Sequence, residues 1–201
     1  SSVGGPPRGG AAARANGAAR SADNVKLDES GKAPQVLQFL GLESGMHAID
    51  LFGGNRYWAE IMAPAVGPKG HVTVWEPSQF YDKDSHEKFA AFQQKARNAH
   101  LIVSPFEAMT LEPSAYDFIM INLNYHDVYW ESPKYGVKRM DPDAFLKTVF
   151  AAMKPGGIVG VIDHVGNPGD TRATVEKLHR IDPAVVKADF ERAGFKLEAE
   201  S

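Results

Sequence analysis

Short apolar runs alternate with longer segments of helical periodicity over most of the chain, from about residue 46 onwards. Apolar runs bounded by Gly, Pro and polar residues indicate buried strands, and apolar positions three or four residues apart indicate covering helices. The predicted strands are 46–52, 71–75, 101–104, 118–122, 158–163 and 195–200. The predicted helices are 34–40, 57–66, 85–98, 142–153 and 183–193, with turns at 67–70 and 154–157.

This order of elements predicts the fold class. Alternating strands and helices at this spacing require right-handed crossovers and a mostly parallel sheet that helices cover on both faces. We therefore expect a three-layer, Rossmann-like α/β domain over residues 25–201. Residues 1–24 are rich in Gly, Ala and Arg and nearly lack large apolar side chains, which predicts a flexible tail.

Composition narrows the possible partners of the 201-residue chain. It has 22 basic and 25 acidic residues, a net charge of -3, without the clustered basic excess that nucleic-acid binding requires. The absence of cysteine excludes a disulfide framework, a thiolate nucleophile and a zinc–thiolate site. No apolar run approaches the roughly 18 residues that a membrane-spanning helix needs. We expect no nucleic-acid partner and no membrane span.

Candidate chemistry follows the strands, because ligands of open parallel sheets bind at the carboxyl ends of the strands. Asp50, Gly53 and Gly54 end the first strand and lead into a helix, where glycines let a ligand approach the backbone. Glu76 ends the second strand, close to the separation of roughly 20 residues at which an acid accepts hydrogen bonds from ribose hydroxyls. Further polar residues follow the later strands in segments 104–107, 122–130 and 163–164.

Five stretches carry a resemblance to a known family: 57–61, 65–70, 124–127, 153–157 and 178–182. With them, residues from about 32 to 201 resemble the class I S-adenosylmethionine-dependent methyltransferases, and more closely a bacterial group of predicted methyltransferases. The Lys-Pro-Gly-Gly turn at 154–157 is common to most of the superfamily, and 124–127 and 178–182 are more specific to the group. The resemblance departs at the glycine loop, where Phe52 and Arg56 stand in place of the first and third glycines.

The resemblance implies a cofactor and roles for individual residues. The implied cofactor is S-adenosylmethionine, with Asp50, Gly53, Gly54 and Asn55 at the methionine end and Glu76 on the ribose. The remaining implied positions are Ser104, Phe106 and Glu107 on the adenine side, and Asn122, Asn124, Tyr125, His126, Asp163 and His164 on the side of the methyl acceptor. Asn122 is counted with the cofactor residues, and Tyr125, His126, Asp163 and His164 are the candidate catalytic residues. His126 is the preferred base because imidazole titrates near neutrality.

Several alternatives stay open at this point. His126 and Asp127 could merely orient a loop. Arg56 could pair with the carboxylate of the methionine moiety or fill the space the cofactor needs, which would leave a silent binding or scaffold protein. An NAD-dependent oxidoreductase is less favoured, because the turn lacks a second glycine pair at the spacing a pyrophosphate needs. A metal site built from His126, Asp163, His164 and His179 is conceivable, but no short ligand spacing supports it.

The methyltransferase reading implies direct in-line methyl transfer to a small molecule. It leaves the compartment open between cytoplasm and export, because relatives often carry export signals whereas the cofactor is made in the cytoplasm. The family sheet has seven strands, whereas only six are predicted here. We expect a C-terminally incomplete domain in which 195–200 does not pair with 158–162, or a second copy or partner that covers the open sheet edge.

Overall fold

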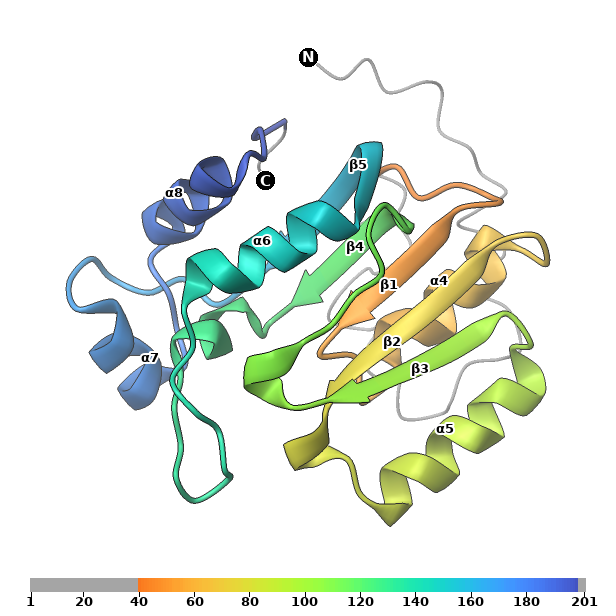
Figure 1. The fold of residues 1–201 in the computed structure, drawn as a ribbon, viewed down its shortest axis with the longest axis horizontal. Coiled ribbons are helices and arrows are strands. Elements are labelled where there is room, and N and C mark those ends of the chain that lie inside the picture. The colour runs from red at the N-terminus through yellow and green to blue at the C-terminus, as the bar shows by residue number, and fades with distance from the viewer. Residues whose placement is uncertain (1–39, 199–201) are drawn as a thin grey trace.

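The computed structural model describes residues 40–198 and contains one five-stranded parallel sheet in the order β3-β2-β1-β4-β5 (Figure 1). The strands are β1 (His47–Leu51), β2 (His71–Pro77), β3 (Ala99–Ser104), β4 (Tyr116–Asn122) and β5 (Met153–Ile162). The helices are α4 (Tyr57–Val66), α5 (Lys83–Lys95), α6 (Pro142–Ala152), α7 (Thr171–Leu178) and α8 (Pro183–Ala193). All strand pairs are parallel, so the mostly parallel three-layer prediction is confirmed.

Two apolar layers hold the helices against the sheet. Helices α4 and α5 bury Ile61, Met62 and Phe89 on one face, together with Val72 and Val74 of β2. Helices α6 and α8 cover the other face, where a second buried cluster includes Leu146 and Val149 of α6 and Ile119 and Ile121 of β4. Successive side chains of a strand point to opposite faces, so each parallel strand supplies both layers, which is why the strands read as nearly continuous apolar runs.

The parallel register brings the carboxyl ends of the strands to one edge. Leu51 at the end of β1 pairs with Trp75 of β2 and with Ile121 of β4. Three short 3₁₀ helices follow the strands at this edge: η1 (Ser78–Phe80) after β2, η2 (Phe106–Ala108) after β3 and η3 (Tyr125–Tyr129) after β4. The residues that follow β1, β2, β3 and β4 therefore meet at one end of the sheet.

The structure corrects three expectations about the elements. Segment 154–157, predicted as a turn, lies inside β5, with a register irregularity opposite Tyr116 and Phe118. Helix α7 was not predicted. The part of 195–200 that is described, 195–198, contains no strand.

The end of α8 explains why 195–198 does not form the sixth strand. Gly194 adopts φ 108°, and the Phe195 N–H donates to the Phe190 carbonyl at 3.0 Å. A glycine with positive φ followed by such a backward hydrogen bond is a helix C-cap of the Schellman type. The Phe195 ring packs against Phe150 and Phe190, with centroids 5.1 and 5.3 Å away. These contacts fix the chain on α6 and α8 rather than at the sheet, as expected for a segment that does not pair with 158–162.

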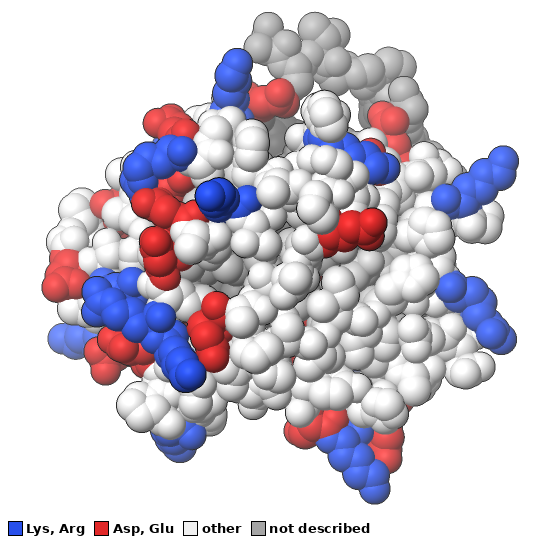
Figure 2. All heavy atoms as spheres, in the orientation of Figure 1, with Lys and Arg blue, Asp and Glu red and all other residues white. Residues whose placement is uncertain are grey.

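Within residues 40–198, no further strand continues the sheet beyond β5. The predicted tail 1–24 and almost all of helix 34–40 lie outside the described residues. In the described part of the chain, no helix combines the length and the apolar character needed to cross a bilayer. On the face drawn in Figure 2, acidic and basic side chains are interspersed and neither sign forms a continuous patch.

Candidate functional site

A cavity of about 340 Å³ opens at the carboxyl end of the sheet. Its walls come from the turn after β1, the end of β2, η1, η2 and η3, which Figure 1 shows at one end of the strands. The lining residues are Phe52, Gly54, Asn55, Glu76, Pro77, Phe80, Phe106, Asn124, Asp127 and Trp130. Of the predicted cofactor residues, Gly54, Asn55, Glu76 and Phe106 thus share one cavity.

In the turn after β1, two non-glycine residues adopt the left-handed backbone conformation that favours glycine. Phe52 and Arg56 adopt left-handed conformations, with φ 60° and 62°. Such a conformation costs a non-glycine residue roughly 1 to 2 kcal/mol. The Phe52 ring packs against Trp75, Phe106 and Phe145, with centroids 4.8, 5.2 and 6.1 Å away. This aromatic packing opposes the backbone strain at Phe52 and makes Phe52 a packing residue.

The two remaining glycines leave room for two buried carboxyl groups. A Cβ on Gly54 would lie 2.6 Å from Glu76 Oε1, and a Cβ on Gly53 would clash with Asp50 Oδ2. At both positions a Cβ would displace an acidic side chain over which the backbone passes, so glycine lets the two carboxyl groups keep their places. Asn55 accepts a hydrogen bond from the Tyr57 N–H at 3.0 Å and so orients the turn at the start of α4.

Asp50 and Glu76 are both unusual acids. Asp50 is 2% exposed, and its Oδ2 atom is buried without a hydrogen-bond partner among residues 40–198. Burial raises the pKa of Asp50 well above its usual range. Burial, together with the nearby Asp82 carboxylate, raises the pKa of Glu76 to about 7, while the Arg56 guanidinium opposes this shift. Buried acceptors without partners are rare in folded proteins, so Asp50 Oδ2 is suited to a ligand that brings a hydrogen-bond donor, and Glu76 offers a carboxyl group at the cavity wall.

Arg56 lies beside the cavity, and the lining residues do not include it. Its Nη1 atom donates to the Gly54 carbonyl at 3.2 Å. The guanidinium thus folds back on the turn that carries it.

The predicted adenine side is only partly at the cavity. Phe106 lines it, and its N–H donates to Gln79 Oε1 at 2.9 Å. Gln79 Nε2 donates to Glu107 Oε2 at 3.0 Å, so Glu107 orients Gln79. Ser104 accepts a hydrogen bond from Trp75 Nε1 at 2.8 Å and does not line the cavity.

On the opposite wall, η3 and the end of β5 form a chain of polar groups. The Asp163 carboxylate accepts from the His126 N–H at 2.8 Å and contacts His126 Nδ1 at 2.7 Å. The other ring nitrogen of His126, Nε2, lies 3.3 Å from Asp127 Oδ1. Asn124 Nδ2 donates to the second Asp127 oxygen at 2.9 Å. Asn124 and Asp127 line the cavity, whereas His126 and Asp163 stand behind them.

The electrostatics of this wall follow from burial and the two carboxylates. Burial of His126 lowers the pKa of its imidazole, but the hydrogen bond to Asp163 and the charges of Asp127 and Asp163 outweigh it, and the net pKa is raised. Burial raises the pKa of Asp127, although the charge of His126 opposes this effect. Asp127 is therefore a better proton acceptor than an ordinary surface carboxylate.

Besides His126 and Asp163, three more predicted acceptor-side residues do not line the cavity. Tyr125 is fully buried, and its hydroxyl donates to Asp189 of α8 at 2.7 Å. Asn122 ends β4 opposite Ile162 of β5. The side chain of His164 is exposed, while its N–H donates to Asp163. Tyr125 thus connects η3 to α8, and His164 contributes its backbone to holding Asp163.

Among the remaining cavity residues, Trp130 and Asp127 lie in the predicted segment 122–130, whereas Phe80 had no signal in the sequence. Phe80 stacks on Trp130, with centroids 6.3 Å apart and planes 16° apart, and both rings line the cavity. Phe80 lies in a short 3₁₀ helix without periodicity, so nothing in the sequence distinguished it from a surface residue. The position of Asp127 within the 124–127 stretch was its only signal. Because Phe52 and Phe106 line the same cavity, its aromatic character suits a planar ligand.

Comparisons with known proteins agree with this architecture. A solved S-adenosylmethionine-dependent methyltransferase from Aquifex aeolicus superposes with a TM-score of 0.65 at 20% identity, covering 88% of this chain and 89% of that one. Another from Mesorhizobium loti superposes with a TM-score of 0.60 at 14% identity, covering 85% and 84%. No protein-family model matches the chain.

The curated relatives are longer than this chain and match it only in part. The chain is 24% identical over 129 residues to a demethylmenaquinone methyltransferase of Listeria monocytogenes, covering 64% of this chain and 49% of the relative. It is 27% identical over 125 residues to the protein of that name from Staphylococcus aureus, covering 62% and 46%. The chain thus spans about half the length of the curated relatives it matches.

The fold and the position of the site define a class. The chain has the Rossmann-like fold of the S-adenosylmethionine-dependent methyltransferases, and its cavity lies at the carboxyl end of the parallel strands. The resemblance to class I methyltransferases that the sequence indicated is thereby confirmed.

Proposed function

We propose that this chain binds S-adenosylmethionine in the cavity at the carboxyl end of the sheet and transfers the methyl group directly, in line, to a small molecule. One observation carries the proposal: Asp50, whose buried Oδ2 has no hydrogen-bond partner among the described residues, and Glu76 lie directly against the backbone of Gly53 and Gly54 in the turn after β1. The relatives and structural neighbours named methyltransferase support the same activity.

The residues present fit such a cofactor. Glu76 would accept hydrogen bonds from the ribose hydroxyls, and Phe106 would contact the adenine at the aromatic side of the cavity. The glycine turn, Asn55 and Asp50 would hold the methionine end, where an ammonium group could supply the donor that Asp50 Oδ2 lacks. When bound, the cofactor would supply a methyl group already activated by its sulfonium. The protein's task is therefore alignment, desolvation and removal of the acceptor's proton.

The acceptor is proposed to lie against the wall formed by Asn124, Asp127 and Trp130. His126, the predicted base, reaches this wall only through Asp127. Asp127 would meet the acceptor, and His126 and Asp163 would support it from behind. Phe80 and Trp130 favour an apolar or planar acceptor group.

The position of Arg56 argues against the silent alternative. A blocking side chain would have to lie in the cavity, whereas the Arg56 guanidinium donates to the Gly54 carbonyl beside it. We propose instead that Arg56 supports the ionised form of Glu76 through its charge.

We also propose that a second copy of the chain or another partner covers the outer edge of β5, the last strand of the sheet among the described residues.

Calorimetry with S-adenosylmethionine and S-adenosylhomocysteine tests the proposal. We expect micromolar binding of both, and Glu76→Ala should weaken it by about 1 to 3 kcal/mol through lost hydrogen bonds. Glu112→Ala, an exposed carboxyl away from the cavity, is the matched control and should bind as the wild type does. Absence of binding to both ligands by the folded wild-type protein would overturn the proposal.

A further inference from the structure

Two histidines and one aspartate converge beside the cavity from separate segments. His126 and Asp127 belong to η3, and His179 caps the C-terminus of α7. One ligand atom from each of the three residues lies within 4.8 Å of the other two. His179 adopts φ 51°, a left-handed conformation that is unfavourable for a residue with a Cβ. His179 adopts this conformation at the end of α7. Its ring lies near the His126 ring, with centroids 5.9 Å apart.

The hydrogen bonds of His126 fix the direction of its free ring nitrogen. A carboxylate can only accept, so the contact between His126 Nδ1 and Asp163 requires the proton on Nδ1. In the neutral ring, the lone pair of Nε2 then faces Asp127 Oδ1 at 3.3 Å. When Nε2 carries no proton, these two acceptors need a cation between or beside them. A proton would satisfy this pair, but it gives no reason for a second imidazole at the same point.

We propose that His126, Asp127 and His179 bind a divalent transition metal ion, such as Zn²⁺ or Fe²⁺, on the acceptor side of the cavity. Two imidazoles and one carboxylate are a donor set that suits such ions and leaves coordination positions open. Ligand atoms about 2.1 Å from a tetrahedral ion lie roughly 3.4 Å apart. The His126 and Asp127 atoms are already at 3.3 Å, and only the exposed His179 side chain has to close in.

The surrounding hydrogen bonds support a metal site. Metal-binding histidines commonly donate their second ring N–H to a carboxylate, as His126 does to Asp163. Asp163 is itself held by the backbone N–H groups of His126 and His164. Asn124 holds one oxygen of Asp127 and leaves the other for the ion. Because Asp127 lines the cavity, the open coordination positions would be available to an oxygen or nitrogen donor of the acceptor.

A competing pair of histidines requires a control. His71 Nδ1 lies 3.2 Å from His100 Nε2 on the exposed surface, at the opposite end of the strands from the cavity. This pair could bind a metal ion weakly without any built surroundings. His100→Ala removes it and leaves the proposed site untouched.

The experiment titrates metal-free protein with Co²⁺, followed by visible absorption, and then displaces Co²⁺ with Zn²⁺. We expect one ion per chain, with binding at least tenfold weaker in both His179→Ala and Asp127→Asn, and unchanged binding in His100→Ala. His179 is exposed, so its replacement should leave the circular dichroism spectrum unchanged. The measurement contains no cofactor, so its outcome is independent of the proposed methyl transfer.

The proposal is overturned if no ion binds below about 1 mM, the weak end of the affinity scale. It is also overturned if His179→Ala, folded by circular dichroism, binds as the wild type does, or if His100→Ala abolishes binding.

Discussion

At the scale of single residues, Glu76 lowers the free energy of unfolding while offering a hydrogen-bond acceptor to a ligand. Its pKa is about 7 in the folded protein, against 4.5 for an ordinary glutamate. Both forms of the chain are protonated at Glu76 below pH 4.5, so the residue changes nothing there. As the pH rises from 4.5 to 7, the unfolded chain releases the proton first, and the free energy of unfolding falls.

Glu76→Gln should therefore stabilise the protein above pH 7, by up to about 3 kcal/mol, since one pKa unit corresponds to roughly 1.4 kcal/mol. The gain should vanish below pH 4.5. In urea unfolding at pH 8 and pH 4, we expect a higher midpoint for the variant only at pH 8. Equal midpoints of variant and wild type at pH 8 would contradict a raised pKa of Glu76 in the folded protein.

The same ionisation predicts the pH dependence of ligand binding. An ionised carboxylate makes stronger hydrogen bonds to hydroxyl donors than a neutral carboxyl group. Affinity for S-adenosylhomocysteine should rise as the pH increases through 7 and level off above it. Glu76→Gln should bind more weakly and show a flat profile between pH 6 and 8. Calorimetry over this range measures both, and a wild-type profile as flat as that of the variant would refute the role of Glu76.

Replacing Arg56 has two separate effects, one on backbone strain and one on the charge near Glu76. Arg56→Gly removes a left-handed non-glycine residue and should stabilise the fold by about 1 kcal/mol. It also removes the charge that favours ionised Glu76 and frees no space in the cavity, so cofactor binding should weaken by up to about tenfold, or 1.4 kcal/mol. Thermal unfolding and calorimetry test the two effects separately. Tighter binding in Arg56→Gly would support the view that this side chain blocks the site.

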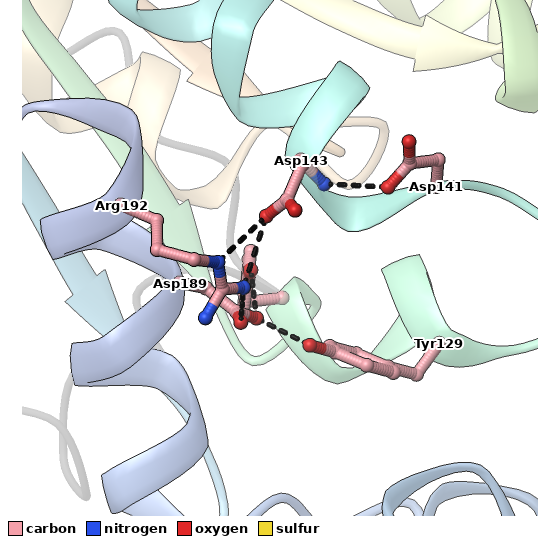
Figure 3. Close-up of polar contacts among 6 residues, drawn as sticks. Tyr129, Asp141, Asp143, Asp189 and Arg192 are labelled. Carbon is pink, nitrogen blue, oxygen red and sulfur yellow. Dashed lines mark hydrogen bonds and ion pairs between the residues drawn. The ribbon is translucent and has the colours of Figure 1, made fainter.

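At the scale of elements, α8 is joined to η3 and α6 by a buried carboxylate. Figure 3 shows Asp189 facing Tyr129 and Arg192, with Asp143 of α6 contacting Arg192 from the other side. Asp189 accepts from Tyr125 and Tyr129 at 2.7 and 2.5 Å and pairs with Arg192. Burial, together with the Asp189 charge, raises the pKa of Tyr125, so the hydroxyl remains a donor at all ordinary pH values.

Asp189→Ala should destabilise the protein by about 1 to 3 kcal/mol, because it leaves the buried Tyr125 hydroxyl without a partner. The control is Asp84→Ala, which breaks an exposed pair with Lys88 at 2.9 Å and should change stability by less than about 1 kcal/mol. Urea unfolding compares the two. An equally small loss in both variants would show that the Asp189 cluster does not hold α8.

The sequence predicted regular elements well and side-chain placement poorly, for a physical reason. Helices α4 and α8 were predicted with their observed bounds, because apolar periodicity and a proline or cap mark their ends. Tyr125 illustrates the opposite case. It lies in the predicted loop after β4, but whether its ring turns to the cavity or to Asp189 depends on α8, which is 64 residues away in the sequence. Helix α7 was missed because only Val175 in it is buried, so it has little apolar pattern.

At the scale of the whole molecule, the cavity is formed by segments that follow four strands, so ligand binding should stabilise the fold as a unit. A ligand that binds only the folded state, at 100 times its Kd, adds about 2.7 kcal/mol to the free energy of unfolding. For a domain of this size, each kcal/mol raises Tm by about 2 to 4 °C. We therefore expect S-adenosylhomocysteine at this concentration to raise Tm by about 5 to 11 °C.

NADH, the control ligand for the oxidoreductase alternative, should leave Tm unchanged. The shift should decrease in Glu76→Ala and persist in Glu112→Ala, because Glu76 lines the cavity and Glu112 does not. A shift with NADH alone would favour the oxidoreductase, and a shift with neither ligand would favour a binding protein that has lost the cofactor.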